Sequence, residues 1–196
     1  MPDEQALIER AKQGELDAFR ELVEGSRMNV YRLAFDLTGN KHDAEDLSQE
    51  VFLKAFRSLA SFRGDSKWST WLYRITVNTN LDHRKKKSEQ LMSYRDDITE
   101  EEPAAMADAQ PANPSPDRIA EGSLIQRRIE HALGRLSPRE RAVFVLRHYH
   151  DLPLKQIAGS LRISEGAVKS FLFRAIQRLQ KELAFYRVDI GMENEQ

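Results

Sequence analysis

The chain has 196 residues, of which 40% are hydrophobic and 31% charged, and its formal net charge is −1. This length allows one medium core or two small ones, and the lack of cysteine excludes disulfides, thiolate metal sites and thiol catalysis. No apolar run approaches the roughly 20 residues of a membrane span, and the start Met1-Pro2-Asp3-Glu4 is acidic where a secretory signal is basic, so we expect a cytoplasmic protein without membrane insertion.

The first 87 residues follow helical rather than strand periodicity. Asp3 is placed to cap a first helix that ends near Gly14, and Asp17 opens a longer helical stretch. We expect this stretch to break at Gly25-Ser26 and to close at Gly39-Asn40. No convincing strand alternation occurs in the sequence, so the predicted fold class is all-α.

An acidic amphipathic helix follows, and Asp43 with Asp46 predicts its start as a variant of the side-chain cap. One face is apolar and carries Ala44, Leu47, Val51 and Ala55, with Phe52, Phe56 and Leu59 beside it. The opposite face carries Asp46, Gln49, Glu50, Lys54 and Arg57. The helix therefore has one side for a core and one side for solvent or a partner.

A second helix, from Trp68 to Leu81, carries a single charge, Arg74, and alternates large rings with hydroxyl and amide side chains. Such a composition is poor for helix propensity, which indicates another use. Flat rings beside amides are suited to stack on and hydrogen-bond unpaired bases, and the run Arg84-Lys85-Lys86-Lys87 suits a phosphate backbone. Composition leaves a second interpretation open, in which the tryptophans are core and the basic run is a solvated helix end.

Charge is segregated along the chain and suggests two domains. Residues 1–87 have a net charge of +1, residues 88–121 a net charge of −7, and residues 122–187 a net charge of +8, before a tail at 188–196. The middle segment holds four prolines among acidic and small residues, so we predict a flexible acidic linker. The basic segment suggests a nucleic-acid partner, and in the free protein we expect the acidic linker to lie on it.

The basic segment begins with a helical pattern through Ile129 and Leu133, and Ser137-Pro138-Arg139-Glu140 then supplies a cap, a first-turn proline and a third-position glutamate. That helix runs to about Tyr149. A short helix over 154–161, a tight turn over 162–164 and a long helix from Glu165 to about Phe185 complete the spacing of a helix-turn-helix.

The last helix has a buried stripe at Val168, Leu172, Ala175, Leu179 and Leu183. It turns Ser170 and Phe173 outward, with Lys169 and Arg174 on the flanks. An exposed phenylalanine is able to pack on a thymine methyl group while the cations reach guanine edges or phosphates. The alternative is that Phe173 belongs to a protein interface.

These residues resemble a known family, the extracytoplasmic-function sigma factors of the sigma-70 family. The first part of the resemblance is Asp43 to Phe62, the sequence Phe62-Arg63-Gly64-Asp65-Ser66, and Trp71-Leu72-Tyr73-Arg74-Ile75 with Asn78. The second part runs from Leu136 through Arg141 to Gly166-Ala167-Val168-Lys169-Ser170 and Phe173-Arg174-Ala175. Both occur in the order of the family and are separated by a linker.

The resemblance implies a promoter-melting helical domain over 1–87 and a helix-turn-helix domain over 122–187 that reads the −35 element. It implies that Asp46, Gln49, Glu50 and Phe52 bind core RNA polymerase. The −10 DNA is then expected at Phe62, Arg63, Trp68, Trp71, Tyr73, Arg74, Asn78, Arg84 and Lys85, some of them around a pocket for a flipped base. Lys169, Ser170, Phe173 and Arg174 are expected at the −35 element, and an anti-sigma factor is an expected partner. On polymerase, the acidic linker is expected to lie in a channel whose walls suit a polyanion.

Two features depart from relatives or compete with this interpretation. Phe171 stands where a basic residue is common, so the upstream sequence preference is not copied from the family. An ordinary helix-turn-helix regulator is the alternative function, although the chain lacks an obvious dimerisation helix. Neither a phosphate-binding glycine loop nor an arranged metal cluster is evident, since His148 and His150 are two apart on a helix, so we predict no enzyme activity, cofactor or metal.

Overall fold

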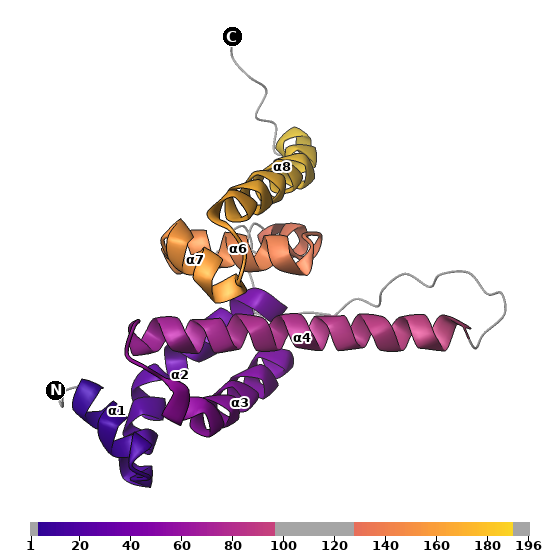
Figure 1. Ribbon diagram of the computed structural model, residues 1–196. Coiled ribbons are helices and arrows are strands. Elements are labelled where there is room, and N and C mark those ends of the chain that lie inside the picture. Colours follow the sequence, from indigo (N-terminus) through magenta and orange to yellow (C-terminus); the bar gives the residue numbers. More distant parts are fainter. Residues whose placement is uncertain (1–3, 97–127, 190–196) are drawn as a thin grey trace, which may run out of the picture.

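A computed structural model describes residues 4–96 and 128–189, and the regular elements of these two ranges are helical (Figure 1). The N-terminal unit, residues 4–96, contains α1 (Glu4–Lys12), α2 (Leu16–Thr38), α3 (Lys41–Ser58), the 3-10 turn η1 (Leu59–Ser61) and α4 (Trp68–Asp96). The C-terminal unit, residues 128–189, contains a helical segment over 128–134, α6 (Pro138–His148), α7 (Leu154–Leu161) and α8 (Glu165–Asp189). The predicted all-α fold is confirmed. None of the helices in these ranges is long and apolar enough to cross a membrane.

The N-terminal unit has its own core where α1, α2, α3 and the start of α4 meet. The predicted apolar stripe of α3 is fully buried there, from Ala44 to Ala55. Helices α2 and α3 share the most extensive contact between two helices in the described chain. The aromatic residues at the start of α4 close this core.

Two helix boundaries in this unit differ from the sequence prediction. α2 continues through Gly25-Ser26 without a break, because Ser26 is buried and its hydroxyl accepts a hydrogen bond from the Trp68 indole at 2.9 Å. α3 begins at Lys41 rather than near Asp43, with Asn40 as its cap. The Asn40 side chain accepts from the backbone N–H of Asp43 at 3.1 Å, so Asp43 is a first-turn residue rather than the cap.

Helix α4 is also longer than predicted. α4 continues past Lys87 to Asp96, so the first nine residues of the segment predicted as flexible linker, 88–96, are helical. Residues 97–121 of that segment and the tail from 190 lie outside the described residues. The expected position of the acidic linker on polymerase or on the basic domain therefore stays a prediction, as do the domain boundaries.

The C-terminal unit follows the sequence prediction closely because its signals are local. Ser137 and Glu140 form a complete capping box with Pro138 in the first turn of α6. The turn after α7 begins at Arg162, whose positive φ of 54° caps that helix in the left-handed conformation. Val168, Ala175 and Leu179 of the predicted stripe of α8 are buried, which confirms its inward face.

α4 lies between the helices of the N-terminal unit and those of the C-terminal unit (Figure 1). One side of α4 packs on α2 and α3, and its other side contacts α7 and α6. Leu33, Leu37 and Val77 of the N-terminal unit form a single apolar cluster with Val143, Ile157 and other residues of the C-terminal unit. The two units therefore meet across a packed interface.

Candidate nucleic-acid and protein interfaces

The outward face of α3 carries the residues predicted to bind core polymerase. Asp46 and Gln49 are exposed. The Glu50 carboxylate lies 2.9 Å from Lys54 Nζ and 2.6 Å from His83 Nε2. Burial opposes ionisation of Glu50, but the hydrogen bonds from Lys54 and His83 outweigh it and lower the pKa of this carboxyl below its ordinary value. The face is thus a fixed acidic and amide surface.

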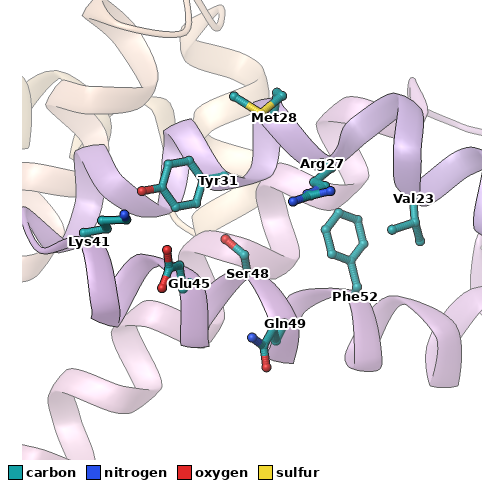
Figure 2. A pocket seen from close by; sticks show the side chains of 9 residues that line it. All are labelled: Val23, Arg27, Met28, Tyr31, Lys41, Glu45, Ser48, Gln49 and Phe52. Carbon is teal, nitrogen blue, oxygen red and sulfur yellow. The ribbon is translucent and has the colours of Figure 1, made fainter.

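A pocket of about 410 Å³ lies beside this face, between α2 and α3. Figure 2 shows the side chains of the two helices on its opposite walls. It is lined by Val23, Arg27, Met28 and Tyr31 of α2 and by Lys41, Glu45, Ser48, Gln49 and Phe52 of α3. Gln49 and Phe52, two predicted polymerase contacts, therefore border an apolar hollow with cations at Arg27 and Lys41.

Further apolar side chains of α2 and α3 are exposed and were not predicted as contacts, and one of them, Met28, lines this pocket. Met28 is 65% exposed, Leu53 57% and Phe56 47%, and Leu16 is also exposed. Phe56 packs edge-on against Phe19, with ring centroids 5.1 Å apart. These contacts could have been predicted from the sequence, because large apolar side chains occur on both sides of α3. A helix with one buried face needs only one apolar stripe.

Three of the four rings expected at the −10 DNA are core residues. Phe62, Trp68 and Trp71 are each at most 4% exposed and pack on one another with centroids 5.0 to 5.7 Å apart. The Trp68 indole N–H donates to Ser26 Oγ, which satisfies its polar atom. The tryptophans are therefore core residues in this structure, as the alternative interpretation has it, and the −10 role of Phe62, Trp68 and Trp71 stays a prediction.

Tyr73 and Asn78, the polar part of the expected base pocket, face the C-terminal unit. The Tyr73 ring meets the His150 ring edge-on at 5.1 Å, and burial raises the pKa of the Tyr73 hydroxyl. The Asn78 amide donates to the carbonyl of Arg74 at 2.8 Å and to the carbonyl of Ser160 at 3.1 Å. These two side chains are engaged within the protein.

The predicted cations of this region are largely exposed. Arg63 is 84% exposed at its side chain and lies 3.4 Å from Asp65. Arg74, Arg84 and Lys85 are exposed as well. Arg84 donates weakly to the Leu37 carbonyl at 3.4 Å. These side chains are placed where a phosphate backbone can reach them.

The helix-turn-helix presents its predicted residues on the start of α8. Lys169 and Ser170 are exposed, and Phe173 is 64% exposed. The first turns of a recognition helix are the part that contacts base edges. Lys169, Ser170 and Phe173 therefore share one accessible surface in the position that this motif uses.

Arg174 is held more tightly than the sequence indicated. Its Nε lies 3.5 Å from Glu140 Oε1, and its guanidinium lies 4.7 Å from the Phe171 ring centroid. Arg178 also donates to Glu140, at 3.0 Å. The Glu140 carboxylate is only 4% exposed, so one buried acid at the start of α6 orients two arginines of α8.

The interface between the two units contains a polar cluster that sequence reasoning missed. His150 Nε2 and Asp36 Oδ2 lie 3.0 Å apart, with the His150 side chain 5% exposed. The Arg141 Nε donates to the Asp36 carbonyl at 3.0 Å. Burial, aided by the neighbouring Arg84 charge, lowers the pKa of Arg141 to about 10. No local sequence signal points to this cluster, because its partners are more than 100 residues apart.

The two histidines considered for a metal site have other environments. The His148 ring packs on Phe144 with centroids 4.6 Å apart, whereas His150 turns toward Asp36. Within residues 4–96 and 128–189, no group of three histidine or acidic side chains is arranged to hold a metal ion.

Comparison with known proteins identifies both units. The sigma-70 region 2 family matches residues 22–90, and the sigma-70 region 4 family matches residues 126–179. The chain is 33% identical over 186 residues to the ECF RNA polymerase sigma factor SigW of Bacillus subtilis, across 90% of this chain and 94% of the relative. It is 34% identical over 172 residues to the ECF sigma factor SigE of Mycolicibacterium smegmatis, across 88% of this chain and 64% of that relative.

A solved structure shares the fold. The sigma factor RpoE from Bartonella quintana, determined with the anti-sigma factor NepR, has a TM-score of 0.63 and 23% identity, over 85% of this chain and 96% of that one. The two family matches, in one chain and in this order, agree with nearly full-length identity above 30%. The chain therefore belongs to the extracytoplasmic-function sigma factors of the sigma-70 family, which direct RNA polymerase to promoters and are not enzymes.

Proposed function

We propose that the outer face of α3 is the surface through which this sigma factor binds core RNA polymerase. Asp46, Gln49, Glu50 and Phe52 form the centre of the contact. The exposed side chains of Leu53 and Phe56 extend it, because apolar area of this kind on a helix face marks a protein interface. The main support for this binding surface is that acidic, amide and apolar groups share one accessible face beside the α2 and α3 pocket.

We assign the −10 element to α4, where core, polar and cationic residues have different roles. Phe62, Trp68 and Trp71 hold the start of α4 in place from inside the core. Tyr73 and Asn78 supply a ring and an amide for an unpaired base, and Arg63, Arg74, Arg84 and Lys85 supply cations for the phosphates. Binding only the unpaired strand shifts the duplex equilibrium toward opening without an energy source.

The −35 element is assigned to the start of α8. Lys169, Ser170 and Phe173 contact the major groove there, and Arg174, oriented by Glu140, contacts the phosphate backbone. The orientation by a buried acid favours a positioning contact over base reading for Arg174.

An anti-sigma factor is the expected regulator, and the cytoplasm is the expected location. RpoE of Bartonella quintana is known in complex with the anti-sigma factor NepR. By analogy, a partner of this kind covers the exposed apolar side chains around the α2 and α3 pocket and competes with polymerase for them. Promoter binding by this chain requires it to reach DNA inside the cell.

Core binding is testable with matched variants. Gln49→Ala and Phe52→Ser remove the amide and the ring at the edge of the pocket, and we expect each to weaken binding to core RNA polymerase by about tenfold or more. Glu21→Ala on the exposed side of α2 serves as the control. Equal affinity of all variants in a fluorescence titration with core polymerase would contradict the assignment of α3.

A further inference from the structure

Phe171 lies within the first two turns of α8, among the residues assigned to the −35 element, but its side chain is partly buried. Its ring packs against the apolar cluster that includes Ile157 and Val168. The guanidinium carbon of Arg174 lies 4.7 Å from the centroid of this ring. Because residues three apart are neighbours on a helix surface, the ring is a fixed flat surface beside the arginine assigned to the phosphate backbone.

Glu140 contacts a second part of the same guanidinium. Its Oε1 lies 3.5 Å from Arg174 Nε, and its side chain is 4% exposed. The carboxylate is itself fixed, because Oε2 accepts hydrogen bonds from the Ser137 backbone N–H and from Arg178 Nη1, each at 3.0 Å. The acid is therefore a fixed partner for Arg174.

The two contacts together restrict the orientation of a planar group. A guanidinium carries five N–H donors in one plane, one on Nε and four on the two Nη nitrogens. Phe171 lies against this group and Glu140 lies at its Nε, while the Arg174 side chain remains 54% exposed. The Nη groups are the edge left for an outside acceptor, and two such N–H groups match the oxygens of a phosphate.

The cluster around Glu140 keeps a positive charge. Arg174 and Arg178 share its one carboxylate, so two guanidinium groups and one acid leave a net charge of +1. Lys169 is a further exposed cation on the same helix. An aromatic ring orients Arg174 without cancelling its charge, which a second acid in the same place would do.

We propose that Phe171 is a positioning residue for the −35 contact, whose ring, together with Glu140, holds the Arg174 guanidinium in the orientation that receives a DNA phosphate. Phe171 acts through Arg174 and does not contact DNA itself. An arginine side chain has many rotamers, and contacts that order it before binding reduce the entropy lost on binding. The inference rests on the proposed contact of Arg174 with the phosphate backbone.

Variants of Phe171 separate its ring from its apolar bulk. Phe171→Leu keeps an apolar side chain in the cluster and removes the ring, whereas Phe171→Tyr keeps the ring. The assay measures fluorescence anisotropy of a duplex that contains the −35 element but ends before the −10 element, bound by the complex of this chain with core RNA polymerase. We expect Phe171→Leu to weaken binding about two- to fivefold, the range of a cation–π contact at an exposed site, and Phe171→Tyr to bind like the parent protein.

Phe144→Leu is the matched control. It makes the same exchange at another partly buried ring of the C-terminal unit, which packs on His148 and Tyr149 rather than on an arginine. Its affinity for the duplex should equal that of the parent protein.

A double-mutant cycle shows whether the ring acts through Arg174. Phe171→Leu should weaken binding in the parent protein but not in an Arg174→Ala background, because the side chain that the ring holds is then missing. A role of Phe171 in the stability of α8 alone would persist in that background. The slope of log affinity against log salt should fall by about one for Arg174→Ala and stay unchanged for Phe171→Leu, which removes no charge.

Nuclear magnetic resonance of the free protein tests the contact without DNA. The δ-methylene protons of Arg174 should resonate upfield because of the Phe171 ring current. This shift should be lost in Phe171→Leu and kept in Phe171→Tyr.

The outcomes separate the positioning role from the proposed function. If Arg174→Ala weakens binding, then unchanged affinity in Phe171→Leu, or an equal loss for Phe171→Leu in the Arg174→Ala background, would overturn the positioning role. If the Arg174 resonances respond to Phe171→Leu as expected but Arg174→Ala binds the duplex like the parent protein, the ring holds Arg174 as proposed and the assignment of Arg174 to the −35 backbone fails.

Discussion

At the scale of single residues, Glu140 has two structural roles. Its side chain closes the capping box of α6 by accepting from the Ser137 backbone N–H at 3.0 Å. The same carboxylate receives Arg174 and Arg178 of α8. Because it is almost fully buried, its partners are needed to offset the loss of hydration. One acid therefore joins the start of the helix-turn-helix unit to its recognition helix.

Glu140→Gln separates these two roles, since glutamine also serves in a capping box but makes no ion pair. We expect a loss of about 1 to 2 kcal/mol in the free energy of unfolding, because both arginines are half exposed and their contributions are reduced by solvent. Urea titration followed by circular dichroism measures this. Glu165→Gln, an exposed first-turn acid of α8, is the control, and an equal loss there would count against the ion pairs.

Trp68 lies in the core, where its indole N–H donates to Ser26. A Trp68→Phe substitution keeps much of the ring contact with Phe62 and Trp71 but leaves Ser26 Oγ without its donor. We expect a loss of about 1 to 3 kcal/mol, and about 3 to 5 kcal/mol for Trp68→Ala. A stability change near zero for Trp68→Ala, measured by denaturant unfolding, would be inconsistent with the buried position.

At the scale of elements, two glycines of the N-terminal unit differ in whether the backbone conformation requires glycine. Gly25 lies inside α2, where an added Cβ would meet nothing within 4 Å. Gly39 ends that helix with a φ of 73°, and an added Cβ there would lie 3.0 Å from Arg141 Nη2. The first is a helix residue with unnecessary backbone freedom, and the second is a required left-handed cap.

Alanine substitutions should therefore differ in sign. Gly25→Ala should stabilise the protein by about 0.5 to 1 kcal/mol, through helix propensity and a less flexible unfolded chain. Gly39→Ala should destabilise it by about 1 kcal/mol or more, because of its backbone conformation and the approach of Arg141. Thermal unfolding compares the two directly. A stabilising Gly39→Ala would refute the cap.

Helix starts and ends were predictable where their chemistry is local. The start of α6 is identified by a signal only four residues long, which contains Ser137, Pro138 and Glu140. The bounds of α7 match the sequence prediction. The predicted break at Gly25 and the predicted helix start at Asp43 were wrong because packing between helices decides both. Helix α2 continues past Gly25 and buries Ser26, and Asn40 supplies the cap of α3.

The residues of the candidate sites were likewise predictable only where the signal in the sequence is local. Exposed polar residues of α3 and of the start of α8 lie where periodicity predicted them. The burial of Trp68 and Trp71 was not predictable, since composition suits a ring to a core or to a base equally well. The pairing of Asp36 with His150 joins residues 114 apart, a distance over which periodicity carries no information.

At the scale of the whole molecule, α4 is shared by two cores. Its tryptophans belong to the N-terminal core, and Val77 belongs to the cluster between the units. Contacts of this kind make unfolding of the two units cooperative. Both tryptophans of the chain report on the N-terminal core alone, whereas circular dichroism reports on all helices.

Unfolding of the parent protein should therefore give coincident transitions by tryptophan fluorescence and by circular dichroism. His150→Gln weakens the contact of this side chain with Asp36 between the units, and we expect the two denaturant midpoints to separate. Asp17→Asn, a change at an exposed acid in the first turn of α2, provides the control. Separate transitions already in the parent protein would indicate that the units unfold independently.

The central claim is that this sigma factor opens promoter DNA with the Tyr73 and Asn78 face of α4 while α3 holds it on polymerase. Sequencing RNA start sites after overexpression supplies a cognate promoter, and permanganate reactivity of unpaired thymines then measures strand opening by holoenzyme. We predict that Asn78→Ala lowers opening by about tenfold or more while core polymerase binding stays unchanged. Opening by Asn78→Ala and Tyr73→Ala holoenzymes equal to that of the parent protein would contradict the account.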